Sequence, residues 1–340
     1  MDKSICIRAD ASTASGSGHV VRASVLATAL RDAGWQVSFA CRTLAGHMND
    51  WLRGQGFTVH DLPPDLADPA ADAAATLAAL PVRPAWFAVD HYGLDARWES
   101  TVAATGAHVL VQDDLGRAHH CDLLLDQNLT NPLHARYLGA ARTLLGPRYA
   151  LIRPAFPALR EAALARRTGQ LERVLVTMGG SDPSNETLKV VQALGMLARP
   201  LAADIVIGSA NPHRAILVQA CARLPGATLH VQTDEMPRLM LEADLALGAG
   251  GGTSWERCCL GLPTLCTVLS DDQDAPSAAL AATGAQRVLG NGAELTPMDY
   301  ARALDALDPE TLRGMAAAAA TICDGQGARH VAAQLDLAHI

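Results

Sequence analysis

The sequence predicts an α/β protein of two domains, each built on a parallel sheet that helices cover on both faces. Three observations lead to this prediction. A chain of 340 residues is too long for one ordinary hydrophobic core. Short apolar runs typical of buried strands alternate with helical segments in both halves. The alternation stops between Leu151 and Pro157, and a charged segment from Arg160 to Glu172 follows, so we expect domains at residues 1–155 and 156–340.

The first domain is expected to contain six strands, because six short runs in it are largely apolar. Proline and aspartate mark helix ends between them: Pro81 stops an alanine-rich helix that begins near Asp68, and Asp95 caps the next helix. The strands are expected at residues 5–7, 37–41, 57–62, 86–90, 109–112 and 123–126, and the helices at 20–31, 48–54, 68–80 and 96–104.

The second domain repeats the pattern, with the last helix of the chain able to pack back on the first domain. Two parallel sheets joined by one linker are expected to face each other across a cleft, where such folds bind ligands. The strands are expected at residues 174–178, 204–207, 228–231, 245–247, 264–268 and 286–289, and glycine-rich loops open helices at 185–197 and 255–260.

Composition excludes several classes of partner. The net charge of −8, with no basic cluster to offset it, argues against nucleic acid. No apolar run is long enough to span a bilayer, so no membrane partner is expected. The first residues lack the basic-then-apolar pattern of a signal peptide, which predicts a cytoplasmic protein.

The eight cysteines predict buried, reduced thiols rather than a metal site. No C-x-x-C occurs, and only Cys258 and Cys259 are adjacent. The run from His119 to Asp122 has no further ligand spaced to join it, so zinc is not expected. No metal and no cofactor is therefore predicted.

The glycine motifs do not match those of dinucleotide or ATP sites. Val21 stands where the loop at Gly16 and Gly18 would need its third glycine, and Thr253 stands at that place in the loop beginning at Gly248. The Walker lysine is also absent. NAD binding and ATP-type phosphate transfer are therefore not indicated.

Two glycine-rich loops of the second domain predict a seat for a diphosphate. Each follows a strand and opens a helix, where backbone N–H groups have no helical partner and bind anions. The alternative role for Asn185 and Thr253 is to cap their helices and not to bind phosphate. Glu256 is either a capping-box glutamate or a carboxylate that accepts both hydroxyls of a ribose. The loop residues concerned are Gly179, Gly180, Ser181 and Asp182 in one loop, and Gly251, Gly252, Thr253 and Ser254 in the other.

The first domain offers a histidine at a strand-to-helix seam. His19 follows Gly16 and Gly18, whose small size lets another molecule approach the backbone. The helix dipole favours neutral imidazole there, the form that a general base needs, whereas the simpler alternative is a glycine turn with a capping polar residue. Polar residues also end the neighbouring strands, a mixture that suits a sugar: Arg8, Asp10, Asp90, Tyr92, Asp113, Asp114 and Asn128. Helix capping is the alternative role for the two adjacent aspartates.

Together these motifs resemble the UDP-2,4-diacetamido-2,4,6-trideoxy-β-L-altropyranose hydrolase family of pseudaminic acid biosynthesis. The stretches that carry the resemblance run in order from Arg8 to Arg257; they are residues 8–22, 90–95, 113–128, 149–154, 178–183 and 250–257. The resemblance implies two Rossmann-like domains of the GT-B type and hydrolysis of a UDP-sugar to UDP and a free sugar. It also implies that His19 matches the family's essential histidine.

The expected mechanism uses both domains, the first for the base and the second for the nucleotide. His19 deprotonates a water that attacks the anomeric carbon with inversion, while the glycine loops hold UDP. A GT-B glycosyltransferase with a UDP-sugar donor is the main alternative, and a non-catalytic nucleotide-sugar sensor is another. The residues assigned to the substrate are Arg8, Asp10, Gly18, Arg22, Asp90, Tyr92, Asn128 and Arg153, and those assigned to the nucleotide are Gly179, Gly180, Ser181, Asp182, Gly251, Gly252, Thr253, Ser254 and Glu256.

Overall fold

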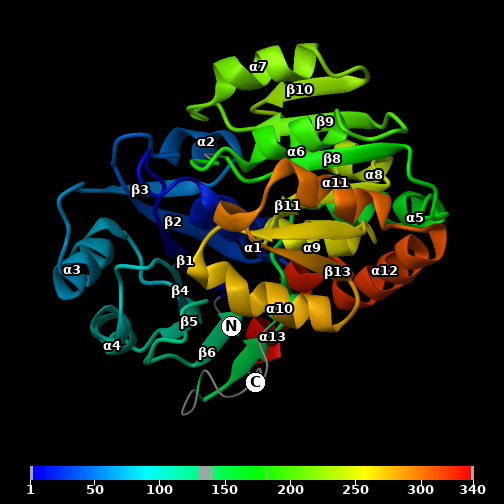
Figure 1. The fold of residues 1–340 in the computed structure, drawn as a ribbon. Helices are drawn as coiled ribbons and strands as arrows, with labels where there is room; N and C mark the ends of the chain where they lie inside the picture. Colours follow the sequence, from blue (N-terminus) through cyan, green and yellow to red (C-terminus); the bar gives the residue numbers. More distant parts are fainter. Residues whose placement is uncertain (1–2, 130–136, 138–140, 181, 338–340) are drawn as a thin grey trace. The chain divides into compact units, whose positions relative to one another are not determined.

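The computed structural model describes residues 3–129, 137, 141–180 and 182–337. The chain divides into two compact units (Figure 1). Unit 1 comprises Met1–Arg153 together with Gln326–Ile340, and unit 2 comprises Pro154–Gly325. The C-terminal segment therefore belongs to the same unit as the N-terminus.

Unit 1 is built on a parallel sheet of seven strands in the order β3-β2-β1-β4-β5-β6-β7. The strand order reverses beside β1, which pairs with β2 on one side and β4 on the other. The loops that leave the carboxyl ends of β1 and β4 therefore start side by side. The strands are β1 (Ser4–Ala9), β2 (Gln36–Arg42), β3 (Thr58–Leu62), β4 (Trp86–Asp90), β5 (His108–Gln112), β6 (Leu123–Asp126) and β7 (Thr143–Leu145).

Helices bury both faces of this sheet. Ile5 and Ile7 of β1 belong to one hydrophobic cluster, and Cys6 between them belongs to another, as the two-residue period of a strand requires. Val331 of the last helix lies in the first cluster, so that helix packs on unit 1. The helices of the unit are α1 (Gly18–Asp32), α2 (Asn49–Gly54), α3 (Pro69–Ala79), α4 (Ala96–Ala103), the short η2 (Pro147–Tyr149) and α13 (Gly327–Leu337).

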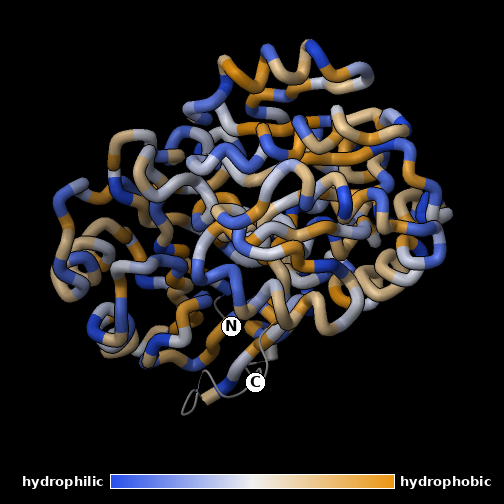
Figure 2. The backbone as a smooth tube through the Cα atoms, in the orientation of Figure 1, coloured by the Kyte–Doolittle hydropathy of each residue, from blue (hydrophilic) through white to orange (hydrophobic). Residues whose placement is uncertain are grey.

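Unit 2 repeats the plan with six parallel strands in the order β10-β9-β8-β11-β12-β13. Its strand order reverses between β8 and β11, whose central residues are fully buried and appear hydrophobic in Figure 2. The strands are β8 (Arg173–Thr177), β9 (Ala202–Ile207), β10 (Ala227–Val231), β11 (Leu245–Ala249), β12 (Thr264–Val268) and β13 (Gln286–Asn291). The helices are α5 (Ala155–Ala165), α6 (Glu186–Leu194), α7 (Arg214–Ala222), α8 (Met236–Glu242), α9 (Thr253–Cys259), α10 (Asp274–Ala282), α11 (Pro297–Asp305) and α12 (Pro309–Ile322), with the short η3 (Asp271–Gln273) and η4 (Gly292–Glu294).

The parallel sheets and the predicted strands are confirmed, with two local differences. Strand β7 was not predicted, because three residues at a sheet edge carry too little periodicity to be recognised. The charged segment after the break begins inside helix α5, which buries Phe156 and Ala163. Arg160 of that helix is partly buried and donates to the carbonyls of Cys259 and Cys323. These bonds explain why a charged residue lies in this position.

The cysteines are free, as predicted. Seven of them are buried and Cys121 is partly buried. Burial raises the pKa of the Cys258 thiol to about 12, so it stays protonated and unreactive. Within the described residues, no group of three potential ligands could hold a metal ion, and no helix is long and apolar enough to cross a membrane.

Candidate active site

A histidine and an aspartate meet where β1 and β4 end. His19 is the second residue of α1, which follows β1, and Asp90 is the last residue of β4. Nδ1 of His19 lies 2.6 Å from Oδ1 of Asp90. Asp90 is buried, whereas 13% of the His19 side chain is exposed. The pair therefore has one partner shielded from solvent and one that reaches it.

The charge on Asp90 determines which nitrogen of His19 carries a proton. Burial by itself raises the pKa of Asp90, but the charge and hydrogen bonds of Arg22, together with the bond to His19, hold it below its ordinary value. An ionised carboxylate only accepts hydrogen bonds, so Nδ1 of His19 must donate. In the neutral ring the lone pair is then on Nε2, the atom that can take a proton from a substrate.

Arg22 holds this pair from the next turn of α1. Its Nε and Nη2 atoms each lie 2.6 Å from one oxygen of Asp90, and its Nη1 lies 3.1 Å from Asp114. Arg22 and Asp90 were expected to contact the sugar. In the structure both side chains contact His19 or each other, and their assignment to the sugar stays a prediction.

Tyr92 forms the exposed side of the cluster. Its ring packs edge-on against the His19 ring, with centroids 4.6 Å apart, and half of the residue is exposed. Its hydroxyl donates to Asp114, and partial burial with that carboxylate raises the pKa of Tyr92 to about 12. Arg117 fixes the turn by donating to the carbonyl of Tyr92, and Asp113 holds Arg117 at 2.7 Å. Asp113 therefore has a structural role, as the capping alternative implied, but it stabilises a turn and does not cap a helix.

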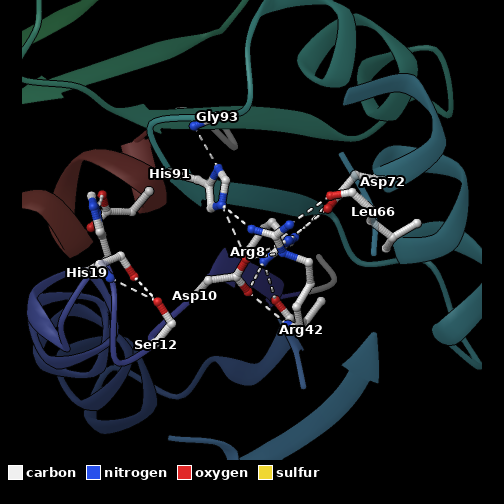
Figure 3. A network of polar contacts seen from close by, with 12 residues as sticks. Arg8, Asp10, Ser12, His19, Arg42, Leu66, Asp72, His91 and Gly93 are labelled. Atoms are coloured by element: carbon white, nitrogen blue, oxygen red, sulfur yellow. Dashed lines mark hydrogen bonds and ion pairs between the residues drawn. The ribbon is translucent and has the colours of Figure 1, made fainter. Parts of the chain in front are cut away.

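Arg8 and Asp10 lie in a buried ionic network (Figure 3). Arg8 is fully buried and its Nη2 lies 2.7 Å from Asp72 and 3.0 Å from Asp10. Nε of Arg42 lies 2.6 Å from Oδ2 of Asp10. Nε2 of His91 lies 3.2 Å from the same oxygen. Both oxygens of Asp10 accept hydrogen bonds from arginines, and the assignment of Arg8 and Asp10 to the substrate stays a prediction. They brace the end of β1 just ahead of the His19 loop.

The remaining predicted sugar residues have looser settings. A side chain at Gly18 would meet no atom, so the start of α1 leaves room above its backbone. Asn128 is half-buried in the loop after β6, and its backbone N–H donates to Asp126. Arg153 is half-buried and is the last residue of the first segment of unit 1. No contact described for Asn128 or Arg153 joins it to His19.

Sequence reasoning did not assign site roles to Arg42, Arg117 and Asp72, whereas Asp114 was among the polar strand-end residues expected to suit a sugar. Arg42 ends β2, Asp114 follows β5 and Arg117 lies three residues further on. Their position at or after strand ends was the only available signal, because their partners lie between 4 and 92 residues away in the chain. Asp72 gave no such signal, since it lies inside α3.

In unit 2, the loop after β11 presents unused backbone donors. Among the described residues, no hydrogen bond uses the N–H groups of Gly251, Gly252 or Thr253. The N-cap of α9 is Gly252, which has no side chain to cap the helix, so the alternative of Thr253 as an ordinary cap is wrong. Side chains at Gly251 and Gly252 would meet no atom. Glu256 lies in the first turn of α9 and is partly buried. The loop has the donors and the open space that an anion requires.

The loop after β8 is more closed. Gly179 has a φ of +85°, and side chains at Gly179 and Gly180 would meet no atom. Asp182 is buried and its two oxygens accept the N–H groups of Glu186 and Thr187, so it caps α6. The assignment of Asp182 to the nucleotide stays a prediction, whereas Asn185 makes no side-chain capping hydrogen bond. Ser181, assigned to the nucleotide, lies outside the described residues.

These two parallel α/β units define the GT-B fold. MurG from Acinetobacter baumannii shares it with a TM-score of 0.74 over 98% of this chain and 99% of that structure, at 18% identity. Glycosyltransferases have the same fold. No protein-family model matches the chain.

Among named proteins, the chain is related to two bacterial sequences. It is 35% identical over 163 residues to the spore coat polysaccharide biosynthesis protein SpsG of Bacillus subtilis (strain 168), a match that spans 47% of each protein. It is 27% identical over 248 residues to the UDP-2,4-diacetamido-2,4,6-trideoxy-β-L-altropyranose hydrolase of Campylobacter jejuni, covering 71% of this chain and 82% of that enzyme.

Proposed function

We propose that the protein is an enzyme that hydrolyses a UDP-linked 2,4-diacetamido-2,4,6-trideoxyhexose of the altrose type. The products are UDP and the free sugar, used for pseudaminic acid biosynthesis. The observation that carries the proposal is the His19–Asp90 pair, a base held in one tautomer at the edge of unit 1. The relationship to the Campylobacter jejuni hydrolase supports the choice of substrate and reaction.

The reaction needs a base more than an acid, because UDP is already a good leaving group. A water oxygen forms a bond to the anomeric carbon while the bond from that carbon to the phosphate oxygen breaks. The water proton goes to Nε2 of His19, and UDP leaves with the bonding electron pair. Attack from the face opposite UDP inverts the carbon. A positioned base of this kind typically accelerates such a step by about 10²–10⁴-fold.

The proposal assigns the nucleotide to unit 2. The free N–H groups of Gly251, Gly252 and Thr253 donate to the diphosphate, and Gly179 and Gly180 offer a second approach. Glu256, in the first turn of α9, accepts the ribose hydroxyls.

The sugar contacts proposed in unit 1 are those left accessible by the ionic network. The exposed ring of Tyr92 offers an apolar surface next to His19, and Gly18 lets the sugar approach the backbone. Asn128 and Arg153 remain proposed contacts for the acetamido groups.

Incubating the purified protein with the UDP-sugar alone tests the reaction. A proton NMR time course should show stoichiometric UDP and free sugar without any acceptor alcohol. UDP-N-acetylglucosamine, as a matched substrate, should be turned over far more slowly. UDP release that requires an added acceptor would instead establish a glycosyltransferase, and binding without turnover would contradict an enzyme.

A further inference from the structure

A buried arginine, Arg257, lies next to the glycine loop of unit 2. Arg257 in α9 is only 1% exposed, and none of the described ion pairs includes it. Its Nε and Nη1 atoms have no hydrogen-bond partner among the described residues. A buried charge with unpaired donors costs free energy unless an anion offsets it. Burial accordingly lowers the pKa of Arg257.

The one nitrogen of Arg257 that is bonded connects the two ends of the loop. Nη2 donates to the carbonyl of Ala249 at 2.8 Å and to Oγ of Ser254 at 2.9 Å. Ala249 immediately precedes the Gly250–Thr253 loop and Ser254 immediately follows it. Losing the guanidinium therefore removes a contact that joins both ends of the loop.

Residues on both sides of the loop fix the position of the Arg257 guanidinium and of Gly250. A side chain at Gly248 would overlap Nη1 of Arg257, so the guanidinium lies directly against the end of β11. The N–H of Gly250 is taken by Gln273, which holds the loop's first residue from the other side. The next three N–H groups are the unused ones.

The hydrogen bond from Arg257 limits the directions in which the Ser254 hydroxyl can donate its proton. Its Oγ accepts from Arg257, and the guanidinium has no lone pair to accept in return. The Ser254 hydroxyl is buried, and no described acceptor takes its proton. Its proton is therefore free to bond a ligand oxygen.

We propose that Arg257 is the positioning residue for the diphosphate of the UDP-sugar, bracing the Gly250–Thr253 loop and directing the Ser254 hydroxyl to a phosphate oxygen. The bound diphosphate in turn supplies the negative charge that the guanidinium lacks. This inference rests on the proposed function and deepens it.

Calorimetric titration of the full chain with UDP, uridine and inorganic diphosphate tests the inference. In Arg257→Met, which keeps the length of the side chain and removes its charge, UDP and diphosphate should bind at least about tenfold more weakly, and uridine within about twofold of wild type. Ser254→Ala should weaken UDP about fivefold, and the double variant should be no weaker than Arg257→Met, because both act through one contact.

Each result of these titrations either supports or overturns the role proposed for Arg257. UDP affinity within twofold of wild type in Arg257→Met, or an equal loss for uridine and UDP, would overturn the proposal. Should circular dichroism show that Arg257→Met is unfolded, Ser254→Ala and Arg257→Lys decide it by the same criterion: unchanged UDP affinity in both overturns it. Wild-type protein that binds diphosphate but not UDP contradicts the proposed function instead, and the variants still report on Arg257 through diphosphate.

Discussion

His19 and Asp90 lie 2.6 Å apart at their Nδ1 and Oδ1 atoms, although 71 residues separate them in the chain. The distance follows from topology, because β1 pairs with β4 and places the residues after each strand side by side. A carboxylate at this distance accepts from Nδ1 of His19, as the buried acid of a catalytic triad does for its histidine.

Replacing either member of this pair should lower turnover more than affinity. We expect His19→Gln to reduce kcat by about 10²–10⁴-fold, because the base is lost. Asp90→Asn should reduce kcat by on the order of 10²-fold or more, since an amide no longer enforces Nδ1 as donor. Steady-state kinetics with the UDP-sugar measures both, and KM should change little.

Asp95→Asn is the matched control for that pair. Asp95 lies in the same loop region but caps α4, a role that asparagine fills equally well. Its kcat should equal that of wild type. Asp90→Asn with wild-type kcat would refute the orienting role.

Adding a methyl group at Gly252 should block an anion without disturbing the fold. Its φ is −56° and a Cβ there meets no atom, so Gly252→Ala is expected to unfold at the wild-type temperature. UDP affinity should fall about tenfold if phosphate approaches the backbone there. Titration calorimetry with UDP measures the effect.

Gly314→Ala provides the comparison for Gly252→Ala. A Cβ at Gly314, inside α12, also meets no atom, and the change should stabilise the helix by about 0.5–1 kcal/mol while leaving UDP affinity unchanged. Equal UDP affinity in both variants would argue against an anion at the loop.

His119 should make the stability of unit 1 depend on pH. Its side chain is buried, with Nδ1 2.7 Å from Glu99 and Nε2 3.6 Å from Asp113. Burial lowers the pKa of His119, but the two carboxylates outweigh it and raise the pKa to about 9 from 6.5. A raised pKa stabilises the fold fully below pH 6.5, and that contribution, on the order of 3 kcal/mol, is lost as pH rises through 9.

Urea unfolding of wild type and His119→Gln at pH 6.5 and 9.5 measures this. The difference in free energy of unfolding between the two proteins should shrink at the higher pH. The pKa of the nearby Cys121 thiol is raised to about 12, so this thiol does not titrate within that range. His120→Gln, at the exposed neighbouring position, should show no such pH-dependent difference. A gap that stays constant with pH would exclude the charged histidine.

Arg8 should matter for stability rather than for binding. Arg8→Met leaves Asp10 and Asp72 buried without their main partner and should cost about 3–5 kcal/mol in the free energy of unfolding. Arg97→Met, which removes an exposed arginine paired with Asp95, should leave the unfolding midpoint unchanged. Chemical denaturation decides between them, and a loss of UDP-sugar affinity in a stable Arg8→Met protein would restore Arg8 as a ligand residue.

The sequence by itself determined the two parallel sheets, all of their strands except β7, and the glycine loops, and it singled out His19. Hydrophobic periodicity and glycine spacing are local properties, so they can be recognised along the chain without knowledge of packing. Only the tertiary structure decided which charged groups pair. Arg8 reaches Asp72 across 64 residues and Arg22 reaches Asp114 across 92, and no local pattern encodes those distances.

Several residues assigned to the sugar are held in ion pairs with other side chains of unit 1. Arg8, Asp10, Arg22 and Asp90 lie at strand ends or on α1 as predicted, yet each is occupied by an opposite charge, because burying an ionised group requires a partner. Asp182 likewise caps α6. The sequence could place these residues at the edge of a sheet, whereas strand pairing and packing decided whether each would face a ligand or another side chain.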